Sequence, residues 1–131
     1  MAKHNELGIR GEQIAADMLI KKRYTILEHN WRHGHLELDI IARNRSEIVF
    51  VEVKTRSDNN LMNPEDAVDF NRKCRLTAAA NYYVLSKRIF NLEPRFDIIA
   101  IILNDRECRV EHFENAFPPT VRTTRTGKKY R

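Results

Sequence analysis

Residues 47–56 constrain the fold of this 131-residue chain more than any other segment. Their apolar centre, Ile48-Val49-Phe50-Val51, is rich in β-branched and aromatic side chains, which is typical of a buried strand. Because side chains two apart share one face of a strand, Phe50, Glu52 and Lys54 point the same way. Buried charge is unfavourable unless it is paired or holds a metal. These two residues alone therefore indicate either a plain ion pair at the rim of a sheet or part of a metal site.

The flanking segments predict a mixed sheet with helices packed on it. Apolar spacing predicts a helix over 6–23, strands over 24–31, 36–43 and 47–56, a helix from Pro64 to about residue 87, and strands over 96–103 and 107–113. Short turns join the first three strands, so these should form an antiparallel meander, and the long helix can cross over to strand 96–103. That strand is almost wholly apolar, which indicates burial on both faces. The fold class is an α/β sandwich of order α-β-β-β-α-β-β.

A hairpin centred on residues 44–46 would bring Asp39 nearly opposite Glu52. Alternation along 36–43 puts Leu38 on one face with Ile40 and Ala42, and Asp39 on the other. Two opposed carboxylates repel each other, and a hard cation such as magnesium between them removes that repulsion. Lys54 could then contact a phosphate or orient an attacking water. Asp39, Glu52 and Lys54 thus suit metal-dependent phosphodiester hydrolysis, with Asp39 and Glu52 as the metal ligands.

Glu12 is a further acidic candidate. Its neighbours Ala15, Ala16 and Leu19 form the apolar stripe that should face the sheet. Glu12 is therefore either a ligand or water-positioning acid near the metal, or a partly exposed acid favoured by the helix dipole.

Other polar residues have weaker patterns. Arg56 and Lys73 are candidates for phosphate contacts, with solvated bases as the alternative. Asp97 is expected to be a structural, hydrogen-bonding acid. An alternative is a transition-metal site whose ligands are spaced by two along one strand: His33, His35, Glu37 and Asp39. Gly34, however, should break the strand that would align these four side chains.

The net charge of +5 lies entirely in the last ten residues, which hold five bases, including Lys128 and Lys129, and no acid. Acids and bases balance in the rest of the chain. We expect a nuclease-like domain over 1–119 and a basic, flexible tail over 120–131. The tail could bind a polyanion such as nucleic acid, or it could simply be solvated.

Several classes of protein are disfavoured. Two cysteines are too few for a disulfide framework, and no apolar run reaches the length that spans a bilayer. The polar N-terminus lacks a secretory signal, so we expect a cytoplasmic protein. Gly-rich phosphate loops, Gly-x-Ser-x-Gly and His-Glu-x-x-His do not occur, which argues against nucleoside triphosphatases, serine hydrolases and common zinc proteases.

Several segments between residues 6 and 103 form a recognisable set: Gly8, Gly11-Glu12, Glu37-Leu-Asp-Ile-Ile-Ala42, Val49-Phe-Val-Glu-Val-Lys-Thr-Arg56, Pro64-Glu-Asp-Ala-Val68, Lys73 and Arg95-Phe-Asp97. In these segments the chain closely resembles the YraN-like family of bacterial proteins. The resemblance implies a restriction-endonuclease-like core related to archaeal Holliday junction resolvases. It implies the nuclease motif Asp…Glu-x-Lys at Asp39, Glu52 and Lys54, with Glu12 completing the acidic cluster. One departure is Leu36, which stands where the family usually has glycine.

Two functions follow from these features. The first is a magnesium- or manganese-dependent endonuclease that acts on DNA, branched or structured DNA included, as a homodimer like the relatives. The second is a non-catalytic module of nuclease fold that docks on nucleic acid or a DNA-repair partner. Cleavage of RNA remains an alternative within the first, because fold alone does not settle substrate.

Overall fold

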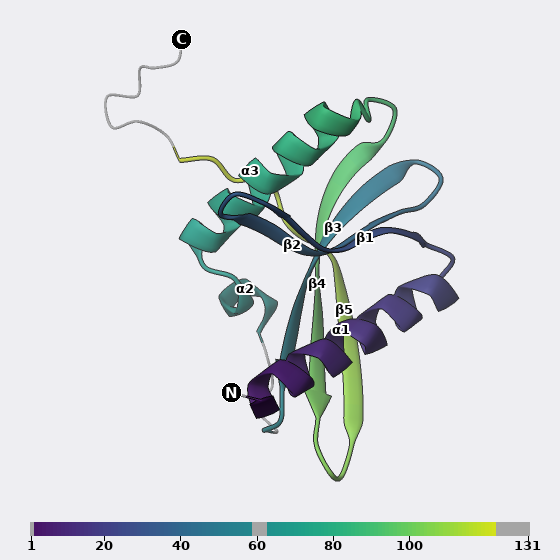
Figure 1. The fold of residues 1–131 in the computed structure, drawn as a ribbon, viewed down its shortest axis with the longest axis vertical. Helices are drawn as coiled ribbons and strands as arrows, with labels where there is room; N and C mark the ends of the chain where they lie inside the picture. Colours follow the sequence, from purple (N-terminus) through teal and green to yellow (C-terminus); the bar gives the residue numbers. More distant parts are fainter. Residues whose placement is uncertain (1, 59–62, 123–131) are drawn as a thin grey trace.

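The computed structural model describes residues 2–58 and 63–122 as a twisted five-stranded sheet with helices packed on it (Figure 1). The elements in chain order are α1 (Ala2–Lys21), β1 (Thr25–His33), β2 (Leu36–Arg43), β3 (Glu47–Arg56), α2 (Pro64–Ala67), α3 (Phe70–Lys87), β4 (Glu93–Leu103) and β5 (Cys108–Phe117). This is the predicted order, with the short helix α2 added.

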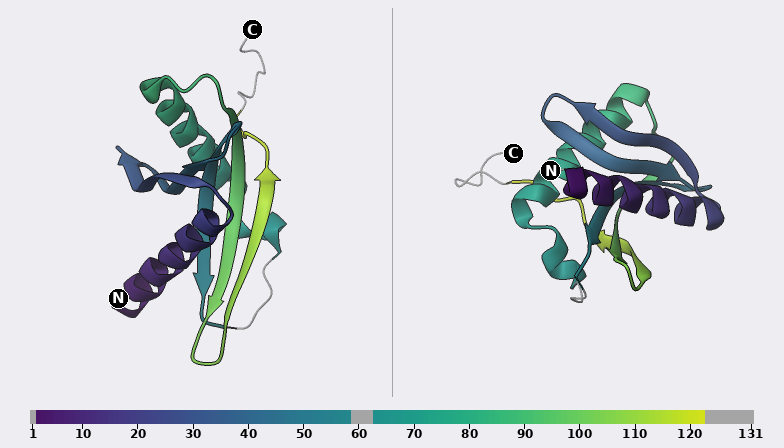
Figure 2. Two further views of the ribbon diagram at one scale, coloured as in Figure 1. Left: turned by 90° about the vertical axis from the view of Figure 1, so that its right-hand side faces the viewer. Right: turned by 60° about the horizontal axis from the view of Figure 1, so that its bottom comes forward.

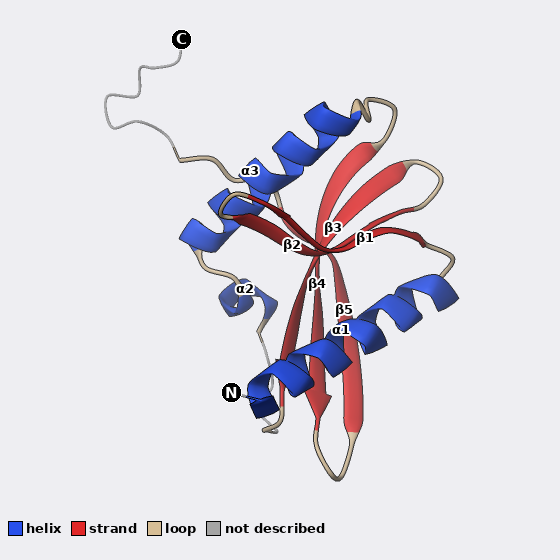
Figure 3. Cartoon of the chain, viewed as in Figure 1, coloured by secondary structure: helices blue, strands red, loops and turns tan. Residues whose placement is uncertain are grey.

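The strands lie in the sheet in chain order, β1 to β5. β1, β2 and β3 form the predicted antiparallel meander. α3 then crosses over, so that β4 pairs parallel to β3, and β5 returns antiparallel along the outer edge of β4 (Figure 3). The sequence prediction of a mixed sheet closed by a helical crossover is therefore confirmed.

Two apolar clusters form the core. In one, Ala15 and Leu19 of α1 pack with Val49 and Val51 of β3. In the other, α3 packs against the opposite face of β3, where Phe50 lies. β4 contributes to both clusters and is buried on both faces, as predicted. The β1–β2 hairpin twists away from the other strands and lies between α1 and α3 (Figure 2).

The structure corrects two predictions near the site. The helix expected from Pro64 to residue 87 is interrupted, because α2 ends at Ala67 and α3 begins at Phe70. Asp69 caps the new start, and its side chain accepts a 2.8 Å hydrogen bond from the backbone N–H of Arg72. Leu38 packs in the cluster that contains α3 and not in the cluster of Ile40 and Ala42, so strict alternation does not hold along β2.

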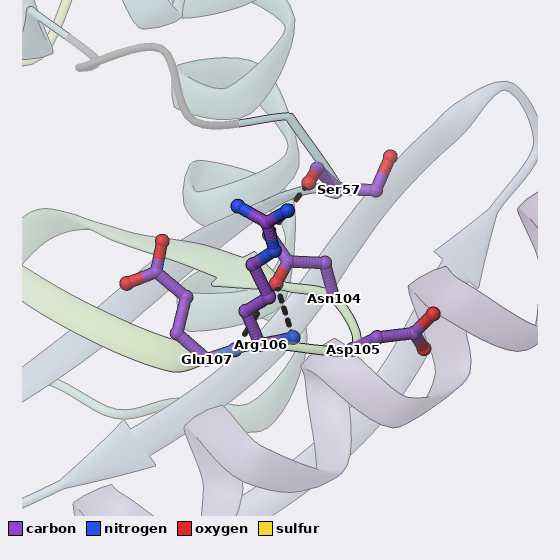
Figure 4. Close-up of a pocket in the computed structure, with 5 residues that line it drawn as sticks. All are labelled: Ser57, Asn104, Asp105, Arg106 and Glu107. Carbon is purple, nitrogen blue, oxygen red and sulfur yellow. Dashed lines mark hydrogen bonds between the residues drawn. The ribbon is translucent and has the colours of Figure 1, made fainter.

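Asparagine side chains fix two hairpin turns. Asn44 Oδ1 accepts hydrogen bonds from the N–H groups of Ser46 and Glu47 between β2 and β3. Asn104 does the same for Arg106 and Glu107 between β4 and β5, and its Nδ2 donates to the carbonyl of Ser57 at 2.8 Å (Figure 4). The shallow hollow at that turn therefore contains a structural bond that ties it to the end of β3.

Asp97 is the structural acid that the sequence predicted. It is fully buried and accepts hydrogen bonds from Arg95, from the Asn115 N–H at 2.9 Å, and from His112, whose Nε2 lies 2.7 Å away. Burial alone would raise the pKa of Asp97, but these hydrogen bonds hold it below its ordinary value.

The expected tail begins in contact with the domain. The Thr120 N–H donates to Thr77 Oγ1 at 2.8 Å, and Arg122 donates to Asn71 on the first turn of α3. Residues 123–131 lie outside the described residues, and with them Lys128 and Lys129. Among the described residues, no helix has the length and apolar character needed to cross a membrane.

Candidate active site

Asp39 lies at the point where the ladder between β2 and β3 ends. The last paired residues are Ile40 and Val51, in the register that the hairpin prediction requires. One residue further, Asp39 Oδ2 accepts a 2.8 Å hydrogen bond from the backbone N–H of Val53. A side-chain carboxylate thus replaces a main-chain acceptor, and this bond fixes Asp39 beside Glu52.

The two carboxylates influence each other strongly. Glu52 is only 5% exposed, so its carboxylate lies almost entirely out of contact with water. Burial and, after it, the charge of Glu52 raise the pKa of Asp39 to about 7, despite the opposing hydrogen bond from Val53. Two acids therefore share a partly dry site, where the negative charge of one disfavours that of the other.

Two bases neutralise Glu52. Arg72 of α3 makes a two-point contact, with Nε 3.2 Å from Oε2 and Nη2 3.1 Å from Oε1. Lys54 Nζ lies 3.6 Å from Glu52 Oε2, and the lysine side chain is 38% exposed. Both carboxylate oxygens of Glu52 therefore have cationic partners, and Lys54 also reaches the surface.

Arg72 is the site residue that sequence reasoning missed. The available signal was helical spacing: Arg72 stands four residues before Leu76 and seven before Ala79, on the buried stripe of α3 that faces the sheet. The N-cap at Asp69 then places Arg72 in the first turn of that helix. Burial would lower the pKa of Arg72, but hydrogen bonding and the charge of Glu52 raise it.

Glu12 lies near the pair on α1. The predicted stripe is buried, with Ala15 and Leu19 fully enclosed, and Glu12 itself is half-buried beside Asn30. Burial raises the pKa of Glu12, the hydrogen bond from Asn30 lowers it, and the charge of Glu52 raises it further. Within the described part of the chain, no three His, Cys, Asp or Glu side chains form a group that could hold a metal. Glu12 therefore adds negative charge to the site without lying at ligand distance.

The predicted phosphate-contact residues lie apart from this centre. Arg56 is exposed at the end of β3, four residues beyond Glu52, or roughly 13 Å along the strand. Lys73 points elsewhere, with its ammonium 5.6 Å from the ring centroid of Phe117.

The four residues of the alternative transition-metal set do not come together in one site. Gly34 has a φ of 62° and turns the chain between β1 and β2, as predicted. His33 stacks on Tyr82 with ring centroids 3.9 Å apart, while Glu37 pairs with Arg32 at 3.4 Å. Asp39 is thus separated from the histidines and joins Glu52 instead.

The donor set fits a hard divalent cation. Asp39 and Glu52 offer carboxylate oxygens from adjacent strands, and magnesium or manganese is commonly held by one or two carboxylates together with water and phosphate oxygens. Their mutual repulsion, evident in the raised pKa of Asp39, is what a cation between them would relieve.

Comparison with known proteins identifies the family. Residues 11–101, which include Glu12, Asp39, Glu52, Lys54 and Arg72, match the family described as uncharacterised protein family UPF0102. A UPF0102 protein of Parabacteroides distasonis is 44% identical over 119 residues, covering 89% of this chain and 96% of that protein. Relatives from Flavobacterium psychrophilum and Bacteroides fragilis are each 46% identical, covering 89% and 91% of this chain and 98% of each relative. The chain therefore belongs to the UPF0102 family.

Proposed function

We propose that this protein is a metal-dependent endonuclease that hydrolyses phosphodiester bonds in DNA, with branched or structured DNA as the first substrate to test. The observation that carries the proposal is the pair formed by buried Glu52 and half-buried Asp39, with the ammonium of Lys54 at its rim. An ion pair with a purely structural role has no use for a second carboxylate forced beside the first.

The roles of the residues follow from their positions. Asp39 and Glu52 would hold magnesium or manganese, which when bound supplies positive charge at the phosphate and makes water more acidic. Asp39 is fixed by its hydrogen bond from Val53, so its carboxylate is already oriented. Lys54 reaches the surface and can position the attacking water or a phosphate oxygen. In the reaction, water adds to phosphorus, the bond to the leaving sugar oxygen breaks, and that oxygen takes up a proton.

Bases outside the carboxylate pair would hold the rest of the substrate. Arg56 extends the line of β3 beyond Lys54, and the basic C-terminal residues add four further charges after Arg122. Such contacts position a nucleic-acid backbone without reading its sequence. A homodimer would place two such sites on one substrate, which suits a DNA with two strands to cut.

One observation favours a second candidate, a non-catalytic module that binds nucleic acid or a DNA-repair partner. Both oxygens of Glu52 already have partners in Arg72 and Lys54, so the residue is electrostatically satisfied without a cation. If the protein is such a module, adding magnesium or manganese should leave its melting temperature unchanged. If Asp39 and Glu52 bind the metal, the added metal should raise the melting temperature.

The decisive experiment is cleavage of labelled four-way junction, flap, duplex and single-stranded DNA, and of RNA, with manganese or magnesium. Asp39→Ala and Glu52→Ala should each abolish cleavage. Glu111→Ala is the matched control, because it removes an exposed carboxylate on β5, the edge strand at the far side of the sheet from β2. Cleavage that survives in folded Asp39→Ala and Glu52→Ala proteins would refute catalysis at this site.

A further inference from the structure

Arg72 occupies the place where a metal would need to bind. Its guanidinium contacts both oxygens of Glu52, at 3.2 and 3.1 Å. A cation held by Asp39 and Glu52 must take at least one of those oxygens. Arginine and cation therefore compete for the same carboxylate.

The structure allows the side chain of Arg72 to move while its backbone stays fixed. The backbone N–H is anchored by the cap of Asp69 at 2.8 Å, so the start of α3 is secured independently of Glu52. The side chain is 21% exposed, compared with 5% for Glu52, so it extends from the buried carboxylate toward the surface. A rotation of the side chain would move the guanidinium from Glu52 to solvent without unwinding the helix.

A released guanidinium at this place has an obvious new partner. Its planar fork matches two oxygens of a phosphate as well as it matches a carboxylate. It would remain within one side-chain length of the carboxylate pair, and so beside the phosphate that is cut.

We infer that Arg72 is an exchangeable counter-ion, which neutralises Glu52 in the metal-free protein, is displaced when a divalent metal binds, and then binds a phosphate of the nucleic acid. This inference rests on the function proposed above and assigns one further binding residue to it. It also explains how Glu52 can be almost fully buried before any metal arrives.

The test compares two arginine variants of the full chain. Arg72→Gln keeps a hydrogen-bond donor for Glu52 but removes the charge. Arg75→Gln makes the same change at an exposed position on the same helix and controls for long-range charge. Manganese binding is measured by titration calorimetry at pH 8. Binding to a four-way junction is measured in calcium, with gels to verify that the DNA stays intact.

The expected effects have opposite signs. Relative to Arg75→Gln, Arg72→Gln should bind manganese about 5-fold more tightly, because the competing cation is gone. It should bind DNA about 10-fold more weakly, because a charge-assisted phosphate contact is lost. A variant that is only structurally damaged would bind both manganese and DNA more weakly.

Other outcomes decide against the inference. Manganese and DNA affinities within twofold of those of folded Arg75→Gln would overturn it, and tighter manganese binding with unchanged DNA affinity would overturn its phosphate part. If circular dichroism shows that Arg72→Gln is unfolded, Arg72→Met is measured instead, because it keeps the length of the side chain and removes its charge. The same two changes in affinity are expected, and affinities within twofold of those of Arg75→Gln would overturn the inference. A wild-type protein that binds neither manganese nor DNA would refute the proposed function itself. If the wild-type protein cuts DNA and the Arg72 variants behave like Arg75→Gln, the inferred role of Arg72 is refuted and the proposed nuclease function is not.

Discussion

At the scale of single residues, the surroundings of Asp39 disfavour the ionised form of its carboxyl group. Burial and the neighbouring charge of Glu52 raise its pKa to about 7. Since a carboxyl group in an unfolded chain ionises near 3.9, the folded protein binds the extra proton between these values. Folding stability should therefore fall as pH rises from about 4 to 7, and stay lowered above that.

Asp39→Asn should remove this effect. The amide oxygen can still accept the hydrogen bond from Val53, but it carries no charge. In metal-free buffer the variant should be more stable than the wild type at pH 8 by up to about 4 kcal/mol, which corresponds to a pKa shift from 3.9 to about 7, and equal to it at pH 4. Urea unfolding at both pH values measures the difference.

Asp17→Asn is the control for that measurement, because Asp17 is an exposed residue of α1. It should change stability little at either pH. An Asp39→Asn protein that is less stable than the wild type at pH 8 would contradict the repulsion.

The catalytic candidates were predictable because they depend on local rules. Strand alternation places Glu52 and Lys54 together, and counting across a short hairpin places Asp39 beside them. Arg72 was not predictable in the same way. Helical spacing puts Arg72 on the buried face with Leu76, but its contact with Glu52 joins residues that are 20 positions apart and depends on how α3 docks on the sheet.

At the scale of elements, the start of α3 is the feature on which the site depends. The pattern after Pro64 predicts helix, and helix forms, but the chain breaks at residues 68–69 and restarts under the cap of Asp69. Sequence patterns detect helical periodicity better than they detect the end of one helix and the start of the next. The predicted face of Leu38 was also wrong, since alternation along a strand says nothing about which packed layer reaches a side chain near the strand's end.

The approach of α1 to β3 offers a test at this scale. A Cβ at Gly11 would lie 2.9 Å from Thr55 Cβ and would overlap the Thr55 hydroxyl. Gly11→Ala should therefore destabilise the protein by about 2 kcal/mol through overpacking. Gly11→Ala should also reduce cleavage, because a shift of α1 at this position would move the neighbouring residue Glu12 relative to the carboxylate pair.

Gly8 provides the matched control on the same helix. No heavy atom lies within 4 Å of a Cβ built there, so Gly8→Ala should stabilise the protein by up to about 1 kcal/mol. Thermal unfolding of both variants, and of Gly11→Ala combined with Thr55→Ala, measures the contact. A double variant no more stable than Gly11→Ala would show that the overlap with Thr55 is not the cause.

At the scale of the whole molecule, the excess of positive charge lies in the last ten residues of the sequence. The residues after Arg122 include four bases and no acids. A chain ending at Arg122 should keep its fold, because Thr120 and Arg122 still contact α3. Its binding to duplex DNA should be weaker, and the slope of log affinity against log salt should fall by up to about 3.6.

Titration of fluorescent duplex at several salt concentrations measures this slope. Replacing the four bases by glutamine in a chain of full length separates charge from length. A slope that stays the same in both proteins would exclude the C-terminal residues from DNA binding.

The positions of the site residues along the chain have a consequence for the rate of folding. Asp39, Glu52 and Lys54 lie on one hairpin, whereas Arg72 arrives only with the helix that follows. A hairpin that closes early brings two carboxylates together before their arginine is in place, which should slow its closure. Asp39→Asn should therefore refold faster than the wild type in stopped-flow experiments at pH 8, and an equal rate would mean that α3 docks before the hairpin closes.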